Sequence, residues 1–432
     1  MRLKYLPLII PKIHVYATAV IMQTAANFTC STKPLGICAR NSSSREEPKP
    51  KDIAVKARFK LQRAAQKLLP YERIADCLRK PIPDANFVIG CFNPDSESSG
   101  FKNLQTCDSY SCPVCANKRA EQDRRKLSVA MAQAQAKGLH VIMVTFTLSH
   151  LVCSTLSATR KGLAQSYDAV FSGGWYQNLK DEYGIKGKIK AWESTYGRNG
   201  WHPHIHMLMF LEYELSPEQI AGFKKFVSKR YMKALDRRGF HASFQHGVDV
   251  RTAESDIADY IAKFGREPQN KTWGADSEIA RIPAKKAALD GLTPFQLLAA
   301  ADGDTDELRH LSVIHEGATD DELKSIAAAL YVEYFKAMKR NPRIVWSDGL
   351  KEFLELDDAL AELDKNAPDI HAADEWFYMI PVGDEWRKVT GRWNTPDLRG
   401  ELLTVTRSGD KVLVHAWLLS RGIQHVMLVD TK

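Results

Sequence analysis

Two histidines in the segment Trp201–Leu208 (WHPHIHML) have a spacing that can hold a cation. The apolar residues of this segment predict a strand, and alternate residues of a strand point to the same face. His204 and His206 therefore point the same way, while Ile205 and Met207 face the core. Two imidazoles on one face supply two ligands of a divalent metal site. Taken alone, such a pair is more often a hydrogen-bonded polar strand face.

Glu193, on the preceding strand, is the candidate third ligand. If Asn199-Gly200 forms the turn of the hairpin, Glu193 lies opposite His206, and if the loop is Gly197–Gly200, it lies opposite His204. Both registers place the carboxylate on the histidine face, and only an odd-length loop or a bulge would turn it away. Two imidazoles and a carboxylate leave coordination positions open. This set suits Mg²⁺ or Mn²⁺ acting as a Lewis acid on phosphate oxygens, although other metals also fit.

Tyr260 is the candidate nucleophile. In a helix expected over residues 253–264, Asp256, Tyr260 and Lys263 follow one another at i, i+4 and i+7 and share a stripe. A metal and an ammonium group close to a phenol favour the phenolate and stabilise a charged transition state. Asp256 could then act as the base for a later attack by water, with Glu254 a less well aligned substitute. Taken alone, the stripe is more consistent with a tyrosine packed in the core and a solvated ion pair.

Four cysteines have a spacing typical of a structural zinc site: Cys91, Cys107, Cys112 and Cys115. The Cys112-Pro113-Val114-Cys115 knuckle carries most of this prediction, and Cys91 is the least certain ligand because it lies far from Cys107. Buried or redox-active thiols are the alternative. The remaining cysteines fit no spacing pattern and are interpreted as ordinary thiols: Cys30, Cys38, Cys77 and Cys153.

The elements that must position these residues alternate between strands and helices. Strands are predicted at 139–148, 188–196, 201–212 and 247–251, and helices at 117–137, 157–183, 216–239 and 253–264. Ser216-Pro217-Glu218-Gln219 has the pattern of a capping box. The order predicts an α+β fold in which a central antiparallel sheet is flanked by helices. A further strand is predicted at Lys411–Ala416.

Length and charge divide the chain of 432 residues further. Residues 1–300 carry 44 Lys/Arg against 27 Asp/Glu, a net charge of +17, and residues 301–432 carry −9. A basic body suggests contact with a polyanion such as nucleic acid. The predicted regions are a poorly ordered extension (1–50), a basic helical and cysteine-rich module (51–137), the sheet domain (138–270), a helical accessory region (271–360) and a small mixed α/β region (361–432).

Two basic helices, at 117–137 and 216–238, are the candidate DNA contacts, and the second carries Lys224, Lys225, Lys229 and Arg230. No Walker A pattern (GxxxxGK[ST]) occurs, so any unwinding of a duplex requires a partner helicase. No stretch reaches the roughly 18 apolar residues of a membrane span. We therefore expect no membrane partner and a cytoplasmic location.

Five motifs together make residues 85–350 resemble the rolling-circle replication initiators of small plasmids. These proteins have HUH endonuclease sites with one tyrosine, and the resemblance is strongest to the branch with an upstream cysteine motif. The first motif is the strand Phe146-Thr147-Leu148-Ser149. The others are His202–Leu208 (HPHxHxL), Glu193-Ser194-Thr195-Tyr196 (ExTY), Tyr260 with Lys263 (YxxK), and Cys112 to Cys115 (CPxC). Gly291–Phe295 and Trp346–Leu350 also resemble stretches of these initiators.

The resemblance implies metal ligation by His204, His206 and Glu193 and an HUH endonuclease fold. It further implies that Tyr260 attacks a phosphodiester at the double-strand origin, keeps the 5′ phosphate and releases a 3′-OH primer. The strand is rejoined later, and host helicase, DNA polymerase and single-strand binding protein act as partners. The chain departs from the family at Asp256, where the family has a glutamate credited with activating the terminating water.

Other functions remain compatible with the residues alone. A related HUH transposase or relaxase would differ in its DNA substrate and share the chemistry. A metal-dependent hydrolase would use water instead of Tyr260 as its nucleophile, and a zinc-ribbon DNA-binding regulator would bind origin DNA without cutting it.

Overall fold

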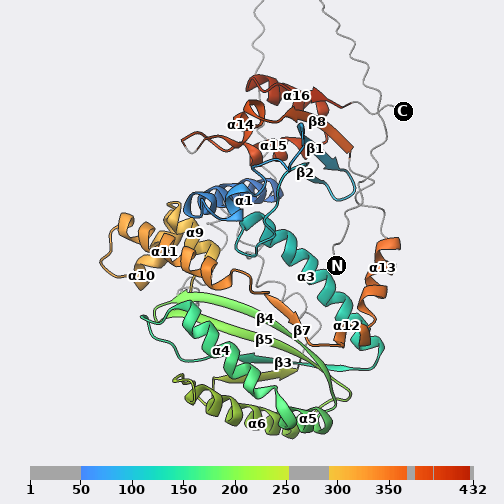
Figure 1. The fold of residues 1–432 in the computed structure, drawn as a ribbon, viewed down its shortest axis with the longest axis vertical. Helices are drawn as coiled ribbons and strands as arrows, with labels where there is room; N and C mark the ends of the chain where they lie inside the picture. The colour runs from blue at the N-terminus through green and yellow to red at the C-terminus, as the bar shows by residue number, and fades with distance from the viewer. Residues whose placement is uncertain (1–49, 253–290, 367–374, 393, 429–432) are drawn as a thin grey trace, which may run out of the picture. The chain divides into compact units, whose positions relative to one another are not determined.

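The chain folds into two antiparallel sheets flanked by helices, as Figure 1 shows. This confirms the predicted α+β class. The computed structural model describes residues 50–252, 291–366, 375–392 and 394–428. These described residues belong to one compact unit. Within them, no helix is both long enough and apolar enough to span a bilayer.

The larger sheet has five strands in the order β6-β3-β5-β4-β7. Its strands are β3 (His140–Phe146), β4 (Ile185–Gly197), β5 (Gly200–Leu211), β6 (Val248–Thr252) and β7 (Ile344–Trp346). All of the pairings are antiparallel. The long central strands β4 and β5 alternate side chains between two buried faces, which explains why their sequences are rich in apolar residues on both faces.

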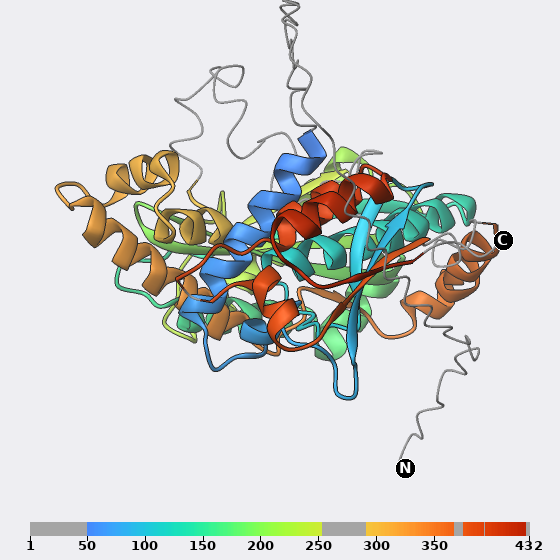
Figure 2. The ribbon, with the colours of Figure 1, turned by 90° about the horizontal axis from the view of Figure 1, so that it is seen from above.

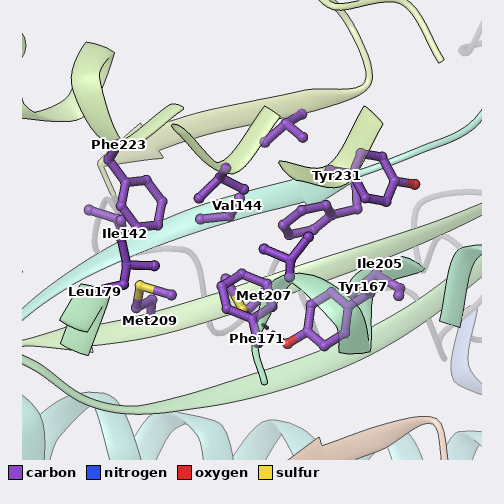
Figure 3. Packing of buried hydrophobic residues seen from close by; sticks show 14 of the residues in the cluster. Ile142, Val144, Tyr167, Phe171, Leu179, Ile205, Met207, Met209, Phe223 and Tyr231 are labelled. Atoms are coloured by element: carbon purple, nitrogen blue, oxygen red, sulfur yellow. Dashed lines mark hydrogen bonds between the residues drawn. The ribbon is translucent and has the colours of Figure 1, made fainter. Parts of the chain in front are cut away.

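One face of this sheet is covered by α4 (Leu156–Val170), α5 (Gly173–Glu182) and α6 (Pro217–Asp236). Figure 3 shows Phe223 and Tyr231 of α6 packed over Val144 and Met207 of the sheet. The predicted capping box of α6 is confirmed, because the Ser216 side chain accepts a hydrogen bond from the Gln219 backbone N–H and the Gln219 side chain accepts one from Ser216. This cap fixes the start of the helix that seals the face.

The opposite face packs against α3 (Pro113–Ala136), α12 (Leu350–Phe353) and α13 (Leu356–Asn366). Met143, Ala191, Leu208 and Phe210 point to this side, and Leu127 of α3 lies against them. His204 and His206 share the face of Leu208 because they lie at even spacings from it on β5. The predicted metal site is therefore on the α3 side of the sheet.

Two motifs that follow residue 290 in the chain hold strand β4 in place. Leu292 pairs with Tyr196 through two backbone hydrogen bonds of 2.7 and 2.9 Å, and Thr293 then caps α9 (Pro294–Ala301) with a capping box. The Ser347 hydroxyl accepts a hydrogen bond from the Lys188 N–H after β7. α10 (Thr305–Ile314) and α11 (Asp320–Met338) pack beyond α9 on a core that includes Tyr196.

The smaller sheet joins residues from opposite ends of the sequence. It has the order β2-β1-β8-β9, formed by β1 (Phe87–Asn93), β2 (Ser98–Lys102), β8 (Glu375–Pro381) and β9 (Val426–Met427). The predicted cysteine module thus shares a sheet with the predicted C-terminal region. Figure 2 shows α1 (Pro50–Leu68) beside the C-terminal helices, and Gly400 allows the close approach, since a Cβ there would lie 3.1 Å from the Lys56 Cα.

The prediction of a strand at Lys411–Ala416 is wrong, because these residues begin the helix α16 (Lys411–Ser420). Asp410 caps the helix by accepting hydrogen bonds from the N–H groups of Val412 and Leu413. Val414 and Leu418, one turn apart, are the buried positions. The helices not yet described are α2 (Arg73–Asp76), α14 (Asp384–Thr390) and α15 (Arg399–Thr406).

Candidate metal and nuclease site

The β4–β5 hairpin sets the geometry of the predicted histidine site. Gly197 pairs with Gly200 and Glu193 with His204, which confirms the second of the two registers considered from the sequence. The turn itself is Arg198-Asn199, and Gly200 takes a φ of +87°, where glycine is favoured. Because the pairing is regular between these residues, Glu193, His204 and His206 all reach the α3 face. Their potential ligand atoms all lie within 4.8 Å of one another.

His206 is held at both ring nitrogens. Its Nδ1 lies 3.1 Å from Thr145 Oγ1 on β3, and its Nε2 lies 3.0 Å from Glu193 Oε2. Ala191 is the direct partner of His206 on β4, and its small side chain leaves room for the Glu193 carboxylate to approach on the diagonal. A separation of 3.0 Å equals that of two ligand atoms bound at right angles with bonds of about 2.1 Å.

His204 has a ring nitrogen that no described residue satisfies. Its Nε2 is buried and finds no hydrogen-bond partner within the residues that the structure describes. Burial, followed by the neighbouring His206 and His150, lowers the pKa of His204 to about 4. The imidazole is therefore neutral above about pH 5 and keeps a lone pair for a cation. This orphaned nitrogen and the adjacent carboxylate fit a divalent metal.

Two further histidines extend the site toward the tip of the hairpin. The His202 ring lies 4.0 Å from the His204 ring between centroids, and the His150 ring lies 4.5 Å from that of His202. Thr147 Oγ1 lies 2.8 Å from His202 Nε2, and burial lowers the pKa of His202 to about 3. Imidazole rings thus continue from His204 to the loop after β3.

A polar network connects the cysteine module to the strand of Glu193. Tyr110, between Cys107 and Cys112 in sequence, donates a 2.5 Å hydrogen bond to Asp123 on α3, and the Arg343 guanidinium lies 5.6 Å from the Tyr110 ring centroid. The Arg343 carbonyl accepts a hydrogen bond from the N–H of Trp192, the residue before Glu193. Burial raises the pKa of Asp123.

The predicted nucleophile and its helix lie outside the described residues, so Tyr260, Asp256, Lys263 and Glu254 have no place in the described geometry. The ends that flank this segment are described. Thr252 ends β6, which pairs with β3 beside the site, and Leu292 pairs with Tyr196, three residues beyond Glu193. Both attachment points of the segment are therefore on the sheet that carries the histidines.

The cysteine cluster differs from its prediction in one ligand. Cys77 joins Cys107, Cys112 and Cys115, and the four sulfur atoms lie within 4.8 Å of one another. Cys91 does not belong to this group: it lies on β1, where its thiol contacts the Gly100 carbonyl oxygen at 3.4 Å. The prediction of Cys91 as a ligand is wrong because β1 places it in the smaller sheet, whereas Cys77 directly follows α2 and packs beside the knuckle.

Sulfur distances in this cluster fit a tetrahedral ion. Cys77 and Cys115 are 3.4 Å apart, Cys107 and Cys115 3.7 Å, and Cys77 and Cys112 3.9 Å. A tetrahedron with zinc–sulfur bonds of about 2.3 Å has edges of about 3.8 Å, whereas a disulfide measures about 2.05 Å. Cys112 is the N-cap of α3, Pro113 its first residue, and Gln62 Nε2 donates to the Cys112 sulfur at 3.3 Å.

The surroundings of Cys107 disfavour its thiolate. Hydrogen bonds with Cys112, Cys115 and Cys77, together with burial, raise the pKa of the Cys107 thiol far above its ordinary value. All four residues are buried, so thiolates there need a compensating positive charge. A divalent cation and the N-terminus of α3 would supply it.

The four basic residues predicted to bind DNA lie on α6, on the sheet face opposite to the histidines. Lys224 forms a 3.4 Å ion pair with Asp249, and Arg230 donates to the Ala169 carbonyl and stacks on Trp175 with 4.5 Å to the ring centroid. Lys225 and Lys229 are exposed. The set therefore divides into two residues with structural contacts and two that face solvent.

Sequence reasoning missed Thr145, Thr147 and Cys77. The two threonines touch the histidines only because β3 pairs with β5, and a single sequence does not reveal this pairing. A search for a fourth cysteine near the knuckle would have found Cys77 and Cys91 together, without a means of choosing between them.

Comparison with known proteins gives two matches. Residues 99–365, more than half of the chain, match the profile of a family described as "Replication protein". The chain is also similar to the "Protein rep" of Streptomyces lividans, with 27% identity over 346 residues that cover 65% of this chain and 71% of that protein. No solved structure matches the chain.

Proposed function

The chain belongs to the replication protein family, and we therefore propose that it initiates rolling-circle replication of a plasmid by nicking one strand at the double-strand origin. The observation that carries this proposal is the convergence of Glu193, His204 and His206 within 4.8 Å, with the buried His204 Nε2 directed at no partner among the described residues. This donor set suits a divalent ion, and a strand-nicking phosphoryl transfer is a reaction that such a site supports.

His204, His206 and Glu193 would hold Mg²⁺ or Mn²⁺, which would supply Lewis acidity at a phosphate oxygen. The chain's own residues prepare for this. Thr145 orients the His206 ring through Nδ1, and burial keeps His204 neutral. Glu193 contributes a negative charge, which strengthens cation binding in a partly buried site.

Tyr260 is the proposed nucleophile. Its phenolic oxygen attacks the scissile phosphorus, the bond from phosphorus to the 3′ oxygen breaks, and that oxygen leaves with a proton as a 3′-OH. The phenol loses its proton, and the 5′ phosphate stays on Tyr260 as a phosphotyrosine ester. Attack by a 3′-OH on this ester reverses the step and rejoins the strand, so cleavage and joining share one site.

Chain length permits this role. Thr252 lies two strands from β5 and level with Met209, which places it roughly 14 Å from His206 at ordinary strand spacings. Eight residue steps separate Thr252 from Tyr260. They cover about 12 Å at the helical rise and about 28 Å when extended. The chain length is therefore compatible with Tyr260 acting at the metal site.

Lys263 and Asp256 have subsidiary roles in the proposal. The Lys263 ammonium would stabilise charge on the phosphate oxygens as Tyr260 attacks. Asp256 would accept the proton of a water that ends the cycle by hydrolysing the phosphotyrosine ester. Because Asp256 is one methylene shorter than a glutamate, we expect hydrolysis to be slower in this chain than in a D256E variant.

The zinc-type cluster is proposed to be structural. Four buried sulfur ligands leave no open coordination position for substrate. A Zn²⁺ ion held by Cys77, Cys107, Cys112 and Cys115 would fix the start of α3, the helix that covers the face of the nuclease site.

We assign the phosphate contacts of α6 to Lys225 and Lys229, since Lys224 and Arg230 already hold neighbouring elements. The K225E/K229E variant should bind origin DNA more weakly and lower the slope of log affinity against log salt by about 0.9 for each phosphate that is no longer neutralised. K224E/R230E should instead lower the thermal midpoint. An unchanged affinity and salt slope in K225E/K229E would remove α6 from the DNA-binding surface.

The test of the proposed function uses supercoiled plasmid carrying its own origin, with Mg²⁺ or with chelator. We expect an open circle with protein linked to its 5′ end in the presence of metal, and no cutting of a plasmid that lacks the origin. Y260F should abolish both cleavage and covalent attachment, whereas Y71F, a change of the same size at an almost fully exposed tyrosine, should do neither. Host helicase, DNA polymerase and single-strand binding protein should then support copying from the 3′-OH.

The alternatives predict other outcomes. A hydrolase with a water nucleophile would keep its activity in Y260F, and a zinc-ribbon regulator would bind the origin without ever nicking it. A transposase or relaxase would cut its own recognition site in preference to the replication origin. Cleavage that persists in chelator would exclude the metal-dependent mechanism.

A further inference from the structure

We propose that an apolar ledge next to the metal site binds an unpaired nucleobase of the DNA strand that is cut. The ledge consists of Leu151 and Val152, in the loop between β3 and α4, which are 68% and 61% exposed. Adjacent aliphatic side chains with this exposure offer a small apolar surface to a ligand. The inference deepens the proposed function and relies on it only for the position of the scissile phosphate.

A row of rings connects the ledge to the metal ligands. Leu151 directly follows His150, whose ring lies 4.5 Å from that of His202, and the His202 ring lies 4.0 Å from that of His204. His204 carries the buried nitrogen that has no partner among the described residues, and it belongs to the candidate ligand group. A nucleotide whose phosphate is bound there can therefore place its own or a neighbouring base against the ledge.

The backbone of the ledge is held rigidly. The Ser154 N–H donates a 2.8 Å hydrogen bond to the Leu151 carbonyl, which closes a turn. The loop then packs on the hairpin so closely that a Cβ at Gly200 would lie 3.1 Å from Val152 Cα. Gly200 precedes His202 by two residues on β5, so the same strand supports the ledge and the ligands. The side chains are presented to solvent in a fixed position.

The chemistry around the ledge favours a nucleotide over a second protein. Arg198 and Asn199, the turn of the hairpin, are exposed beside the loop that packs on Gly200. An apolar surface accepts the face of any base, and a guanidinium attracts the adjoining phosphate. A paired base in a duplex has both faces stacked, so only an unpaired one is free to occupy the ledge.

The deciding experiment measures binding and needs no cleavage. Fluorescein-labelled dT20 is titrated with the full-length protein in chelator, and dissociation constants are obtained from anisotropy. We expect L151S/V152S to bind about tenfold more weakly than the wild type. V412S/L413S, a matched exposed pair on α16, the helix that packs against the smaller sheet, should bind as the wild type does. Equal thermal midpoints of the three proteins establish that each is folded.

Equal affinity of wild type and L151S/V152S for dT20 would overturn the proposal. If L151S/V152S also differed from the wild type in oligomeric state, measured by sedimentation, the ledge would be a contact between copies of this chain. Absence of nicking by the wild type would reject the proposed function. The dT20 measurement would still show whether the ledge binds single-stranded DNA.

A second measurement locates the base. Single abasic nucleotides are placed along an oligonucleotide that spans the nicking site, again in chelator. At one position, we expect the abasic substitution to weaken wild-type binding about tenfold and to leave L151S/V152S unaffected, because the two changes remove the same contact. Additive losses at every position would contradict the assignment.

Discussion

The two candidate metal centres of this chain are built in opposite ways. The cysteine cluster has four buried ligands of one type, brought together from the end of α2, a loop and the first turn of α3. The histidine site has three ligands of two types on a single hairpin, and Glu193 and His204 are only partly buried. A metal site whose coordination positions are all filled by protein can only stabilise the fold, whereas a site with free positions can bind a substrate. The difference separates the two roles before any activity is measured.

Replacement of Cys77 tests the closed centre and should have the largest effect on stability. C77A removes one of four ligands, so we expect bound zinc to fall from about one ion per chain to near zero, with a loss of stability on the order of 5 kcal/mol. Zinc content by mass spectrometry and thermal unfolding check this. C91A is the matched control, and it should keep its zinc. If the C77A variant kept its zinc and the C91A variant lost it, the ligand set expected from the sequence, with Cys91, would be the correct one.

Replacement of His206 tests the open centre. H206A should reduce nicking by about 1000-fold, equivalent to roughly 4 kcal/mol of transition-state stabilisation, while the fold and the zinc content remain. Initial rates on supercoiled origin plasmid measure the loss. H140A, at the exposed start of β3, should nick at the wild-type rate. If H206A unfolded the chain instead, the histidine site would be a structural centre and the contrast between the two sites would fail.

His204 contributes to the pH dependence of stability, and His202, whose pKa is lowered to about 3, acts in the same direction. An imidazole in the unfolded chain titrates near pH ~6.5, whereas burial lowers the pKa of His204 in the folded chain to about 4. Between these values the unfolded state binds the additional proton, so the free energy of unfolding falls as the pH is lowered. The full contribution, about 3 kcal/mol, is present above pH ~6.5 and is lost by about pH 4. Unfolding in chelator from pH 7 to 4 measures this, and the slope should be shallower in H204A.

Thr145 allows the smallest and most specific test. T145V keeps the shape of the side chain and removes the hydroxyl that contacts His206 Nδ1, so metal affinity at the histidine site should fall 10–100-fold. Isothermal titration with Mn²⁺ provides the measurement. T147V removes the corresponding contact to His202, which is not in the ligand group, and should change the affinity much less. Equal losses in both variants would mean that the threonines act on the sheet as a whole.

Local patterns determined a large part of this chain. The alternation in WHPHIHML put His204 and His206 on one face, and the even-length turn kept Glu193 with them, because side-chain direction in a hairpin depends only on the parity of the spacing. The Ser216–Gln219 box located the start of α6 for the same local reason.

Tertiary structure decided what depends on distant segments meeting. It selected Cys77 over Cys91, brought Thr145 to His206, and paired β1 with β8 across nearly 290 residues. At Lys411–Ala416 the apolar run suits either a strand or a helix, and the Asp410 cap together with burial of Val414 and Leu418 decided for the helix. Such choices rest on packing between remote residues, which the order of amino acids along the chain does not display.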